Sequence, residues 1–381
     1  MDFLTPEQEM WRETVFRFME EEVGRDYVRE KDRNREYPYE GYAKIVSQGW
    51  IGLLVPEERG GQGGDIFAYA LMCEGLARYG PDFATALMVP MFTAQNIVHH
   101  GTPEQAAGYI EPFLAGEMRF VISLSEPQAG SDAANARTRA RRNGDEWVVN
   151  GQKLWNSGGG AKGAVLCALV RTEAGSEKHD GLSVMLIPND APGVTVHKIE
   201  ALARRATGSN TIFFDDVRLP GHALLGAEGQ GWQIMTEHLE LERISIAAGY
   251  VGCAQQAVDD ACDYARTREQ FGQPIFDFQV IRHMLADMQT RVDAARLLTY
   301  RAAAAVNGGE PCPKEAAMAK LFASETLQEV SRQGVQIMGG IGTTPEADME
   351  RYFREGMQAT IGGGTSQIQR TIIARHMRHA R

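Results

Sequence analysis

Apolar residues in roughly the first 115 positions recur at the three- and four-residue steps typical of helices. Thr5 is predicted to cap a helix, because a proline and an acidic first turn follow it. Further helices are predicted over residues 67–79 and 85–100, after a glycine-rich loop at 55–64. Apolar side chains share one face of the first predicted helix: Trp11, Val15 and Phe18.

Between about residue 117 and residue 219 the pattern changes to short apolar runs separated by Gly, Asn and Asp turns. Strands are predicted over residues 120–124, 147–149, 164–170, 182–187 and 211–214. Because no helix-length segment alternates with them, we expect an antiparallel β domain. Residues 158–163 match the pattern G-x-G-x-x-G, but a strand follows them where a dinucleotide-binding fingerprint requires a helix. The dinucleotide-fold interpretation is therefore rejected.

From about residue 230 to the C-terminus the helical spacing returns. Helices are predicted over residues 232–264 and 314–338, the second after a Gly-Pro break at 308–311. Between them, apolar residues follow the seam of a bundle helix: Phe278, Ile281, Leu285, Met288, Val292, Ala295 and Leu298. Three domains are predicted in chain order: residues 1–116, 117–222 and 223–381.

Composition excludes several classes of function. The 381 residues are 43% hydrophobic and 23% charged, as in ordinary globular proteins, and the net charge of −11 argues against a nucleic-acid binder. No apolar run reaches the ~18 residues of a membrane span, and the N-terminus lacks the order of a signal peptide. The five cysteines are scattered, which predicts no metal site, no disulfide framework and a cytoplasmic location.

Glu242 is the one acidic residue in an apolar stripe of the predicted helix 232–264: Met235, Leu239, Glu242, Ile246, Gly249 and Cys253. A carboxylate on such a face has to be paired, bound to a ligand or partly neutral, because burial disfavours its charge. Two interpretations stay open: a general base with a raised pKa, or a buried ion pair with an arginine from another helix. Arg243 is not expected to be that partner, since adjacent helical residues point apart.

Three consecutive glycines at 362–364 precede Thr365, which is predicted to cap a C-terminal helix. A glycine-rich bend that opens a helix suits an anion or a polar cofactor, because free N–H groups point out of it. The alternative is a loop that only permits a turn.

Six motifs in order make the chain resemble the acyl-CoA dehydrogenases over essentially its whole length. They are LSEPQAGSD (124–132), GQKLWNSGG (151–159), FDDVRLP (214–220), RTREQFG (266–272), QIMGGIG (336–342) and TIGGGTSQIQR (360–370). The resemblance implies an α+β fold with an N-terminal helical domain, a central antiparallel β-barrel-like domain and a C-terminal four-helix bundle. It also implies FAD as cofactor, an acyl-CoA substrate and an electron-transfer flavoprotein as partner.

The resemblance assigns roles residue by residue. FAD is implied to lie between the β domain and the C-terminal bundle. Its flavin ring is implied to contact Leu124, Ser125, Trp155 and Ser157, while Ser131 contacts a cofactor phosphate or the substrate. Residues implied to reach the FAD of a neighbouring subunit are Arg268, Phe271, Gln279, Gln336 and Gly340. Dinucleotide contacts are implied for Thr365 and Gln367. A homotetramer, or at least a dimer, follows by analogy.

The chain departs from the commonest family pattern at the glycine loop. Most members carry an aromatic residue and then the catalytic glutamate directly before Gly-Thr, where this chain has Gly362 and Gly363. A minority, including isovaleryl-CoA dehydrogenase, place the glutamate on the helix directly before an arginine, and Glu242–Arg243 matches that arrangement. The resemblance therefore implies Glu242 as the base and a substrate site that includes Ser131, Arg243, Gly362 and Gly363. The missing side chains predict a branched, cyclic or otherwise substituted acyl group.

Other functions remain compatible with the same residues. An enoyl-CoA reductase of the crotonobetainyl-CoA type, or an acyl-CoA oxidase, would use the same base and flavin. A non-catalytic acyl-CoA- or flavin-binding protein is the alternative from another class, in which the missing loop glutamate signals lost activity.

Overall fold

The computed structural model describes residues 4–176, 178–309 and 311–377. Residues 1–3 of the predicted N-terminal sequence and Glu310 of the predicted 308–311 break therefore lie outside the described residues. The chain divides into two compact units: unit 1 is Met1–Glu30, Asp65–Ala84 and Glu240–Arg381, and unit 2 is Lys31–Gly64 and Thr85–Leu239. None of the described helices is long and apolar enough to cross a membrane.

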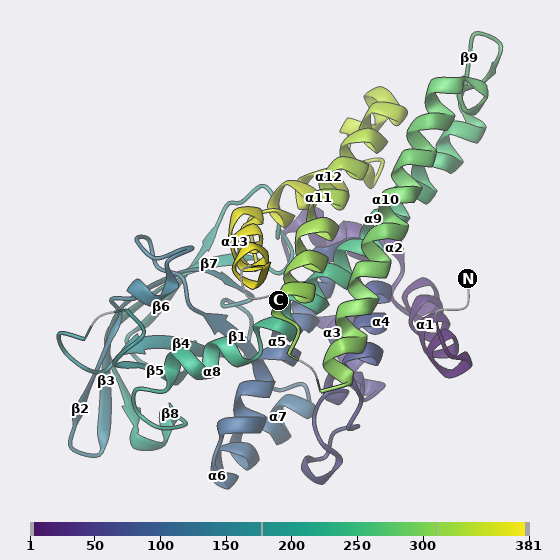
Figure 1. Cartoon of the computed structure of the whole chain (residues 1–381). Helices are drawn as coiled ribbons and strands as arrows, with labels where there is room; N and C mark the ends of the chain where they lie inside the picture. Colours follow the sequence, from purple (N-terminus) through teal and green to yellow (C-terminus); the bar gives the residue numbers. More distant parts are fainter. Residues whose placement is uncertain (1–3, 177, 310, 378–381) are drawn as a thin grey trace. The chain divides into compact units, whose positions relative to one another are not determined.

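Figure 1 labels most of the elements along the chain. The α-helices are α1 (Pro6–Phe18), α2 (Arg25–Asn34), α3 (Tyr39–Ser47), α4 (Ile66–Leu76), α5 (Pro81–His100), α6 (Pro103–Gln105), α7 (Glu111–Leu114), α8 (Gly231–Glu237), α9 (Leu239–Thr267), α10 (Gln279–Asn307), α11 (Pro313–Met338), α12 (Met349–Ala359) and α13 (Ser366–Met377). The strands are β1 (Arg119–Ser123), β2 (Arg139–Asn143), β3 (Glu146–Ser157), β4 (Ala164–Arg171), β5 (Leu182–Pro188), β6 (Val194–Ile199), β7 (Ser209–Pro220), β8 (Leu224–Leu225), β9 (Glu269–Gln270) and β10 (Gln273–Pro274).

Helix α1 begins as the sequence predicts. The Thr5 hydroxyl accepts a hydrogen bond from the Gln8 N–H, and the Gln8 side chain accepts one from the Thr5 N–H, which together form a capping box. On the predicted apolar face, Val15 is fully buried and the Trp11 indole donates to the carbonyl of Ala68 on α4. The face predicted from spacing is therefore the face that packs.

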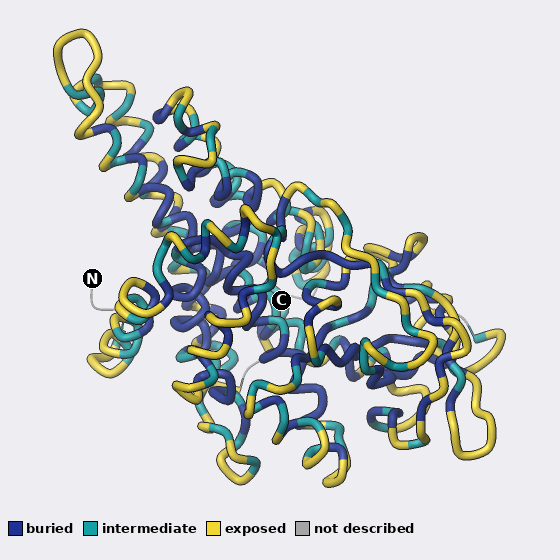
Figure 2. Tube along the Cα trace, turned by 180° about the vertical axis from the view of Figure 1, so that it is seen from behind, coloured by how far each residue is buried: buried dark blue, intermediate teal, exposed yellow. Residues whose placement is uncertain are grey.

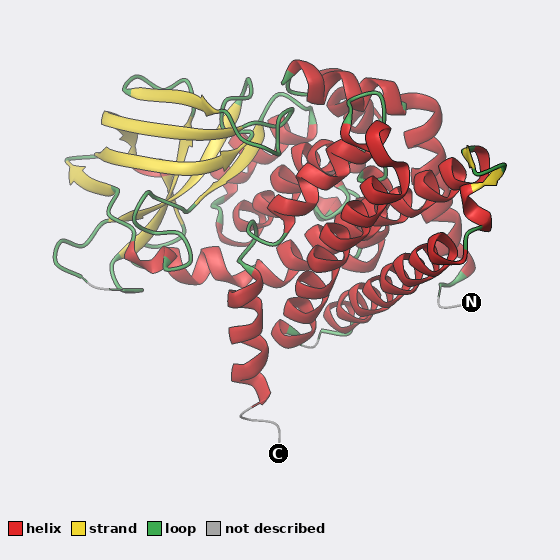
Figure 3. Ribbon diagram, turned by 90° about the horizontal axis from the view of Figure 1, so that it is seen from above, coloured by secondary structure: helices red, strands yellow, loops and turns green. Residues whose placement is uncertain are grey.

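The central β segment forms one eight-stranded sheet in unit 2, drawn in yellow in Figure 3. Its strand order is β6-β7-β3-β2-β4-β5-β8, and β1 pairs with β4 outside that path. Most pairs are antiparallel, as predicted, but β1 runs parallel to β4, and β2 meets β4 in the same sense at one position. The β2–β3 hairpin lies between β1 and β4 along the chain, so the chain can cross back and enter β4 in the same direction as β1.

Burial explains which strands the sequence reveals. Strands β4 and β5 are buried along almost their whole length, so they appear as continuous apolar runs. Strands β2 and β6 were not predicted: β2 is largely polar with one buried residue, and the apolar residues of β6 are only partly buried. The sheet packs on one apolar core that includes Val121, Trp147, Leu166, Met185 and Phe214.

The glycine-rich segment 158–163 connects β3 directly to β4. Gly158 and Gly163 take positive φ angles of 75° and 71°, which explains why glycine stands at both ends of the turn. No helix follows the segment, so the rejection of a dinucleotide-fold fingerprint is confirmed.

Unit 1 contains the helical bundle, in which α10 packs against α11, and α11 packs against α12 and α13 (Figure 1). The predicted seam of α10 is buried at Leu285, Met288, Val292 and Ala295. It is less buried at Phe278, close to the exposed β9–β10 hairpin that forms the yellow tip in Figure 2.

The single helix predicted over residues 232–264 is wrong. Helix α8 ends at Glu237 and α9 begins at Leu239, because His238 between them leaves helical geometry with φ −101° and ψ 14°. Met235 therefore lies on a different helix from Glu242 and does not belong to its stripe. Neither glycine nor proline occurs around the break, so local sequence carries no signal for it.

Candidate active site

Glu242 lies in the first turn of α9, with a partly buried side chain. Burial raises the pKa of this carboxyl above its ordinary value, and the positive charges of Arg243 and Lys320 lower it in part. The direction of the pKa shift agrees with the prediction from the apolar stripe. Burial also raises the pKa of Tyr69 on α4, and the charge of Glu242 adds to that effect. The carboxylate and the phenol therefore share one poorly solvated region of unit 1.

Arg243 was not expected to be the ion-pair partner of Glu242, and no ion pair joins the two side chains among the described residues, but the charge of Arg243 still acts on the carboxylate. It is the positive charge with the largest effect on the Glu242 pKa. Burial lowers the pKa of Arg243 itself, and the neighbouring carboxylates Glu242 and Glu240 oppose that shift. The Arg243 Nε is shielded from solvent and has no hydrogen-bond partner among the described residues. A buried guanidinium with an unsatisfied donor can bind a polar ligand.

The glycine loop turns toward Glu242 at one position. Gly363 has a φ of 64°, in the left-handed region that favours glycine. A Cβ added to Gly363 would lie 3.6 Å from Glu242 Oε1 and 2.8 Å from Ile246 Cδ1. Lys320 Cε is 3.7 Å from the same point. A side chain at position 363 and the carboxylate of Glu242 therefore point to the same region of unit 1.

Gly362 faces a different side chain from Gly363. The Nε2 of Gln358 lies where a Cβ of residue 362 would stand. At both glycines the end of a neighbouring side chain lies close to the Cβ position, Gln358 Nε2 at Gly362 and Ile246 Cδ1 at Gly363, so the expectation that the two glycines leave room for the substrate stays a prediction.

A buried lysine supports the loop. Lys320 on α11 donates from Nζ to the carbonyl of Ala359 at 3.0 Å and to that of Gly364 at 2.8 Å. Gln369 Nε2 donates to the carbonyls of Gly363 and Gly364, both at 3.1 Å. Sequence reasoning missed both residues. A signal existed for the lysine, because it interrupts a buried alanine-rich face: Ala316, Ala317, Ala319 and Ala323.

Thr365 caps α13, as predicted, since its hydroxyl accepts a hydrogen bond from the Ile368 N–H at 3.2 Å. Gln367 in the first turn of α13 is exposed. The role of these two residues in binding a dinucleotide stays a prediction.

The motif at 124–132 is held against the end of β3 in unit 2. The Leu124 carbonyl accepts a hydrogen bond from Lys153 Nζ at 3.1 Å, and the Ser125 carbonyl accepts one from the Leu154 N–H at 2.8 Å. Lys153 also forms an ion pair with Glu126 at 2.8 Å, and both side chains are buried. Burial would raise the Glu126 pKa, but Lys153 and two backbone N–H groups hold it at about 2. Sequence reasoning missed this ion pair, which holds residues 124–126 against β3.

Strand β3 carries Trp155 and Ser157 directly after these contacts. Trp155 has a φ of 63° and the residue is 57% exposed, an unusual state for a strand tryptophan. The structure therefore brings Leu124 and Ser125 next to the strand segment that holds Trp155 and Ser157. Ser131 is exposed, and no contact within the described residues joins it to this group.

All five residues expected to reach a neighbouring subunit are exposed in the single chain: Arg268, Phe271, Gln279, Gln336 and Gly340. Phe271 stands at the tip of the β9–β10 hairpin with 95% of its surface exposed, and touches Phe278 edge to face. Gly340 lies in a short 3-10 turn, Gly339–Thr343, and a Cβ there would meet no atom within 4 Å.

Comparison with known proteins assigns the family. Models of the acyl-CoA dehydrogenase N-terminal, middle and C-terminal domains match residues 5–117, 121–217 and 229–378. The chain belongs to the acyl-CoA dehydrogenase family. Enzymes of this family use FAD and act on CH–CH bonds, and this chain is an acyl-CoA dehydrogenase with the helical–β–helical fold of the family.

Relatives match this acyl-CoA dehydrogenase over most of their length. It is 38% identical to the probable acyl-CoA dehydrogenase YngJ of Bacillus subtilis over 98% of both chains. It is 39% identical to the human mitochondrial short-chain specific acyl-CoA dehydrogenase over 88% of this chain and 82% of that one. The structure of butyryl-CoA dehydrogenase from Megasphaera elsdenii superimposes with a TM-score of 0.93 at 32% identity, covering all of both chains.

The residues of this acyl-CoA dehydrogenase fit a flavin dinucleotide. The exposed Trp155 offers a planar face, and Ser125 and Ser157, held near it by the backbone contact of Ser125 with Leu154, carry hydroxyls that can donate or accept hydrogen bonds. FAD supplies the redox chemistry, while the protein supplies binding and orientation.

Proposed function

We propose that Glu242 is the catalytic base of this acyl-CoA dehydrogenase. The observation that carries the proposal is the 3.6 Å distance between Glu242 Oε1 and the Cβ position of residue 363. Residue 363 matches the place where most family members carry their glutamate. A carboxylate from the helix can therefore occupy the region that a loop carboxylate would reach.

The chemistry follows from that placement. Glu242 takes a proton from the α-carbon of the acyl thioester, and the C–H electron pair forms the α,β double bond as hydride leaves the β-carbon. FAD, when bound, accepts that hydride. The carboxyl of Glu242 then holds the proton, and the product is the α,β-unsaturated thioester.

The surroundings of Glu242 suit a general base. Because burial raises its pKa, the carboxylate binds a proton more strongly than a solvated one. Arg243 and Lys320 oppose that shift, so the ionised form is still available before the reaction. Burial therefore makes the Glu242 carboxylate more basic, while the charges of Arg243 and Lys320 limit the rise in its pKa.

We further propose an acyl group that is branched, cyclic or otherwise substituted near the α-carbon. Glycine at 363 places no side chain beside Glu242 Oε1, where the α-proton has to lie, and the nearest atom to its Cβ position is the terminal methyl of Ile246, which can move aside. The end of Gln358 fills the space next to Gly362, so a substituent on the acyl group is proposed to lie on the side of Gly363 and the base. The similarity to a short-chain specific enzyme favours a short acyl chain that carries such a substituent. Arg243 is proposed to donate from Nε to a polar group of the bound thioester.

Electrons are proposed to pass to an electron-transfer flavoprotein, and the chain is proposed to form a homotetramer or at least a dimer. The exposed set that includes Phe271 and Gly340 supports a contact between subunits. An oxidase or an enoyl-CoA reductase is the alternative. Reoxidation of the substrate-reduced enzyme by an electron-transfer flavoprotein, but not by oxygen, supports the dehydrogenase; rapid reoxidation by oxygen supports the oxidase.

An anaerobic titration with CoA thioesters tests the base and the substrate together. The FAD-loaded enzyme is mixed with matched straight, α-branched, β-branched and cyclic esters, and loss of flavin absorbance is followed. The Glu242→Gln variant should keep FAD and lose reduction by about 10²–10⁴-fold. Glu240→Gln is the matched control, because that carboxylate on the same helix instead accepts a hydrogen bond from the Cys312 N–H. Equal reduction of Glu242→Gln and parent contradicts the base assignment, and preference for straight chains contradicts the substrate assignment.

A further inference from the structure

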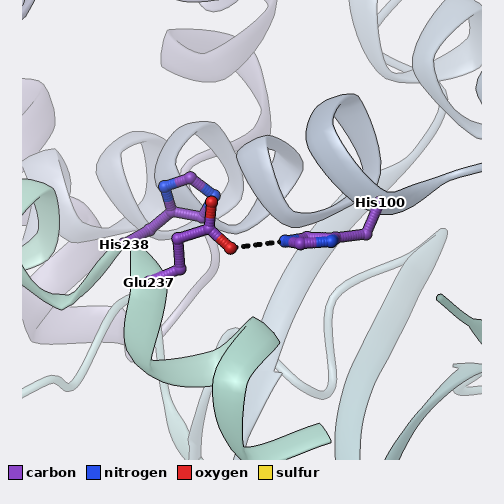
Figure 4. A group of neighbouring side chains, drawn as sticks. All are labelled: His100, Glu237 and His238. Carbon is purple, nitrogen blue, oxygen red and sulfur yellow. Dashed lines mark hydrogen bonds and ion pairs between the residues drawn. The ribbon is translucent and has the colours of Figure 1, made fainter. Parts of the chain in front are cut away.

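Two helices of unit 2 end at a cluster of metal-ligating side chains. His100 is the last residue of α5, Glu237 is the last residue of α8, and His238 occupies the break before α9. Figure 4 shows the carboxylate of Glu237 between the two imidazole rings. The proposed acyl-CoA chemistry uses none of these residues.

The cluster has the donor types of a zinc-binding site. His100 Nε2 lies 2.7 Å from Glu237 Oε2, and one donor atom from each residue lies within 4.8 Å of the other two. Ligands at about 2.0–2.2 Å from a tetrahedral zinc stand roughly 3.3 Å apart, so small side-chain rotations bring these three atoms into range. Glu237 is exposed and the two histidines are partly buried, so an ion can enter from solvent.

An ordinary ion pair does not explain the third residue. The contact between His100 and Glu237 is satisfied as a solvated pair, but His238 Nε2 is shielded from water and has no hydrogen-bond partner among the described residues. The ring of His99 lies 4.8 Å from that of His238, and His99 Nδ1 is already bonded to the Gln95 carbonyl. A second imidazole nitrogen without a partner, beside an exposed carboxylate, is a free metal donor.

We propose that His100, Glu237 and His238 bind one divalent transition-metal ion, with zinc as the best match, and that water completes the coordination. Two imidazoles and one carboxylate suit zinc, cobalt or nickel and disfavour magnesium, which prefers oxygen ligands. The ion would join the C-terminal ends of α5 and α8 and hold the break that precedes α9. Cysteine spacing carries no information about this site, because no ligand is a cysteine and His100 lies 137 residues from Glu237.

Metal binding is tested on the full-length FAD-loaded enzyme after treatment with a chelator. Calorimetric titration with zinc chloride should give one saturable site per chain, and magnesium chloride should give none. Each of His100→Gln, Glu237→Gln and His238→Gln should weaken binding by at least about tenfold. His197→Gln, an exposed histidine on β6, is the control and should bind as the parent does.

Thermal unfolding supplies a second readout. Zinc should raise the Tm of the parent and of the His197 variant, and the same zinc concentration should raise the Tm of the three ligand variants less. Comparison of Tm values without metal separates loss of a ligand from loss of the fold. Absence of saturable binding, or equal weakening in the control, overturns the proposal. Because none of the three residues is assigned to the reaction, flavin reduction by substrate does not depend on this result.

Discussion

Relocating the base from helix to loop is the sharpest test of the active site. The change is Gly363→Glu in the Glu242→Gln background, which removes the helix carboxylate and offers one from the loop. Because the Cβ of residue 363 would lie 3.6 Å from Glu242 Oε1, a glutamate there can place its carboxylate in the same region. The double variant should therefore reduce its flavin at least tenfold faster than Glu242→Gln alone.

The magnitudes decide in favour of rescue. Loss of a general base raises the barrier by about 3–5 kcal/mol, for a rate loss of about 10²–10⁴-fold. A non-glycine residue at the φ of 64° costs roughly 1–2 kcal/mol. The new Cβ would clash with Ile246 Cδ1, the flexible end of a side chain. A change of the Ile246 rotamer relieves the clash and costs ~1 kcal/mol. The strain lowers stability, but it is smaller than the barrier that a working base removes.

The same change in the parent should be harmful. Two carboxylates about 5 Å apart repel by roughly 3 kcal/mol at an effective dielectric constant of about 20. Gly363→Glu should therefore destabilise the parent more than it destabilises Glu242→Gln. The four proteins form a double-mutant cycle in urea unfolding, and the coupling free energy measures that repulsion.

Single-turnover flavin reduction under anaerobic conditions is the assay, with a short-chain CoA ester as substrate. Gly362→Glu in the Glu242→Gln background is the matched control, because Gln358 and not Glu242 faces that position. It should give no rescue. The contradicting result is a Gly363→Glu double variant that folds and binds FAD, reduces its flavin no faster than Glu242→Gln, and shows no coupling free energy in the cycle. Side chains at positions 242 and 363 would then not reach the same region.

Four further predictions concern buried charges. Folding raises the pKa of Glu242, so ionisation of this carboxyl opposes the fold. Glu242→Gln should therefore raise the free energy of unfolding at pH values above that raised pKa and leave it unchanged below about pH 4. Urea unfolding across this pH range measures the difference. Lys320→Met removes a positive charge that lowers the Glu242 pKa, so the acidic limb of the pH–rate profile should move to higher pH. Lys314→Met, at the start of the same helix, should not move it. Lys153→Met should cost about 3–5 kcal/mol, as it leaves Glu126 buried and unpaired, and adding Glu126→Gln should restore part of that loss. With its folded pKa at about 2, Glu126 should contribute stability in the parent that is lost as pH falls from its ordinary pKa toward 2, and this dependence should disappear with Glu126→Gln.

The sequence alone determined the features that depend on local pattern. The Thr5 cap, the buried runs of β4 and β5, and the seam of α10 follow from periodicity and side-chain chemistry over a few residues. Glu242 was also visible, because one carboxylate interrupts an apolar stripe. Its raised pKa follows from that composition, although the stripe is shorter than predicted.

Tertiary structure decided what depends on contacts between distant segments. The parallel pairing of β1 with β4 reflects chain return around the β2–β3 hairpin, and the α8–α9 break at His238 has no local breaker residue. Only the folded loop shows that Gly363 faces Glu242 while Gln358 fills the space at Gly362, since backbone φ angles and long-range packing set those directions. Burial of Lys320 against the loop carbonyls belongs to the same class, because spacing within one helix cannot reveal which carbonyls another segment brings to it.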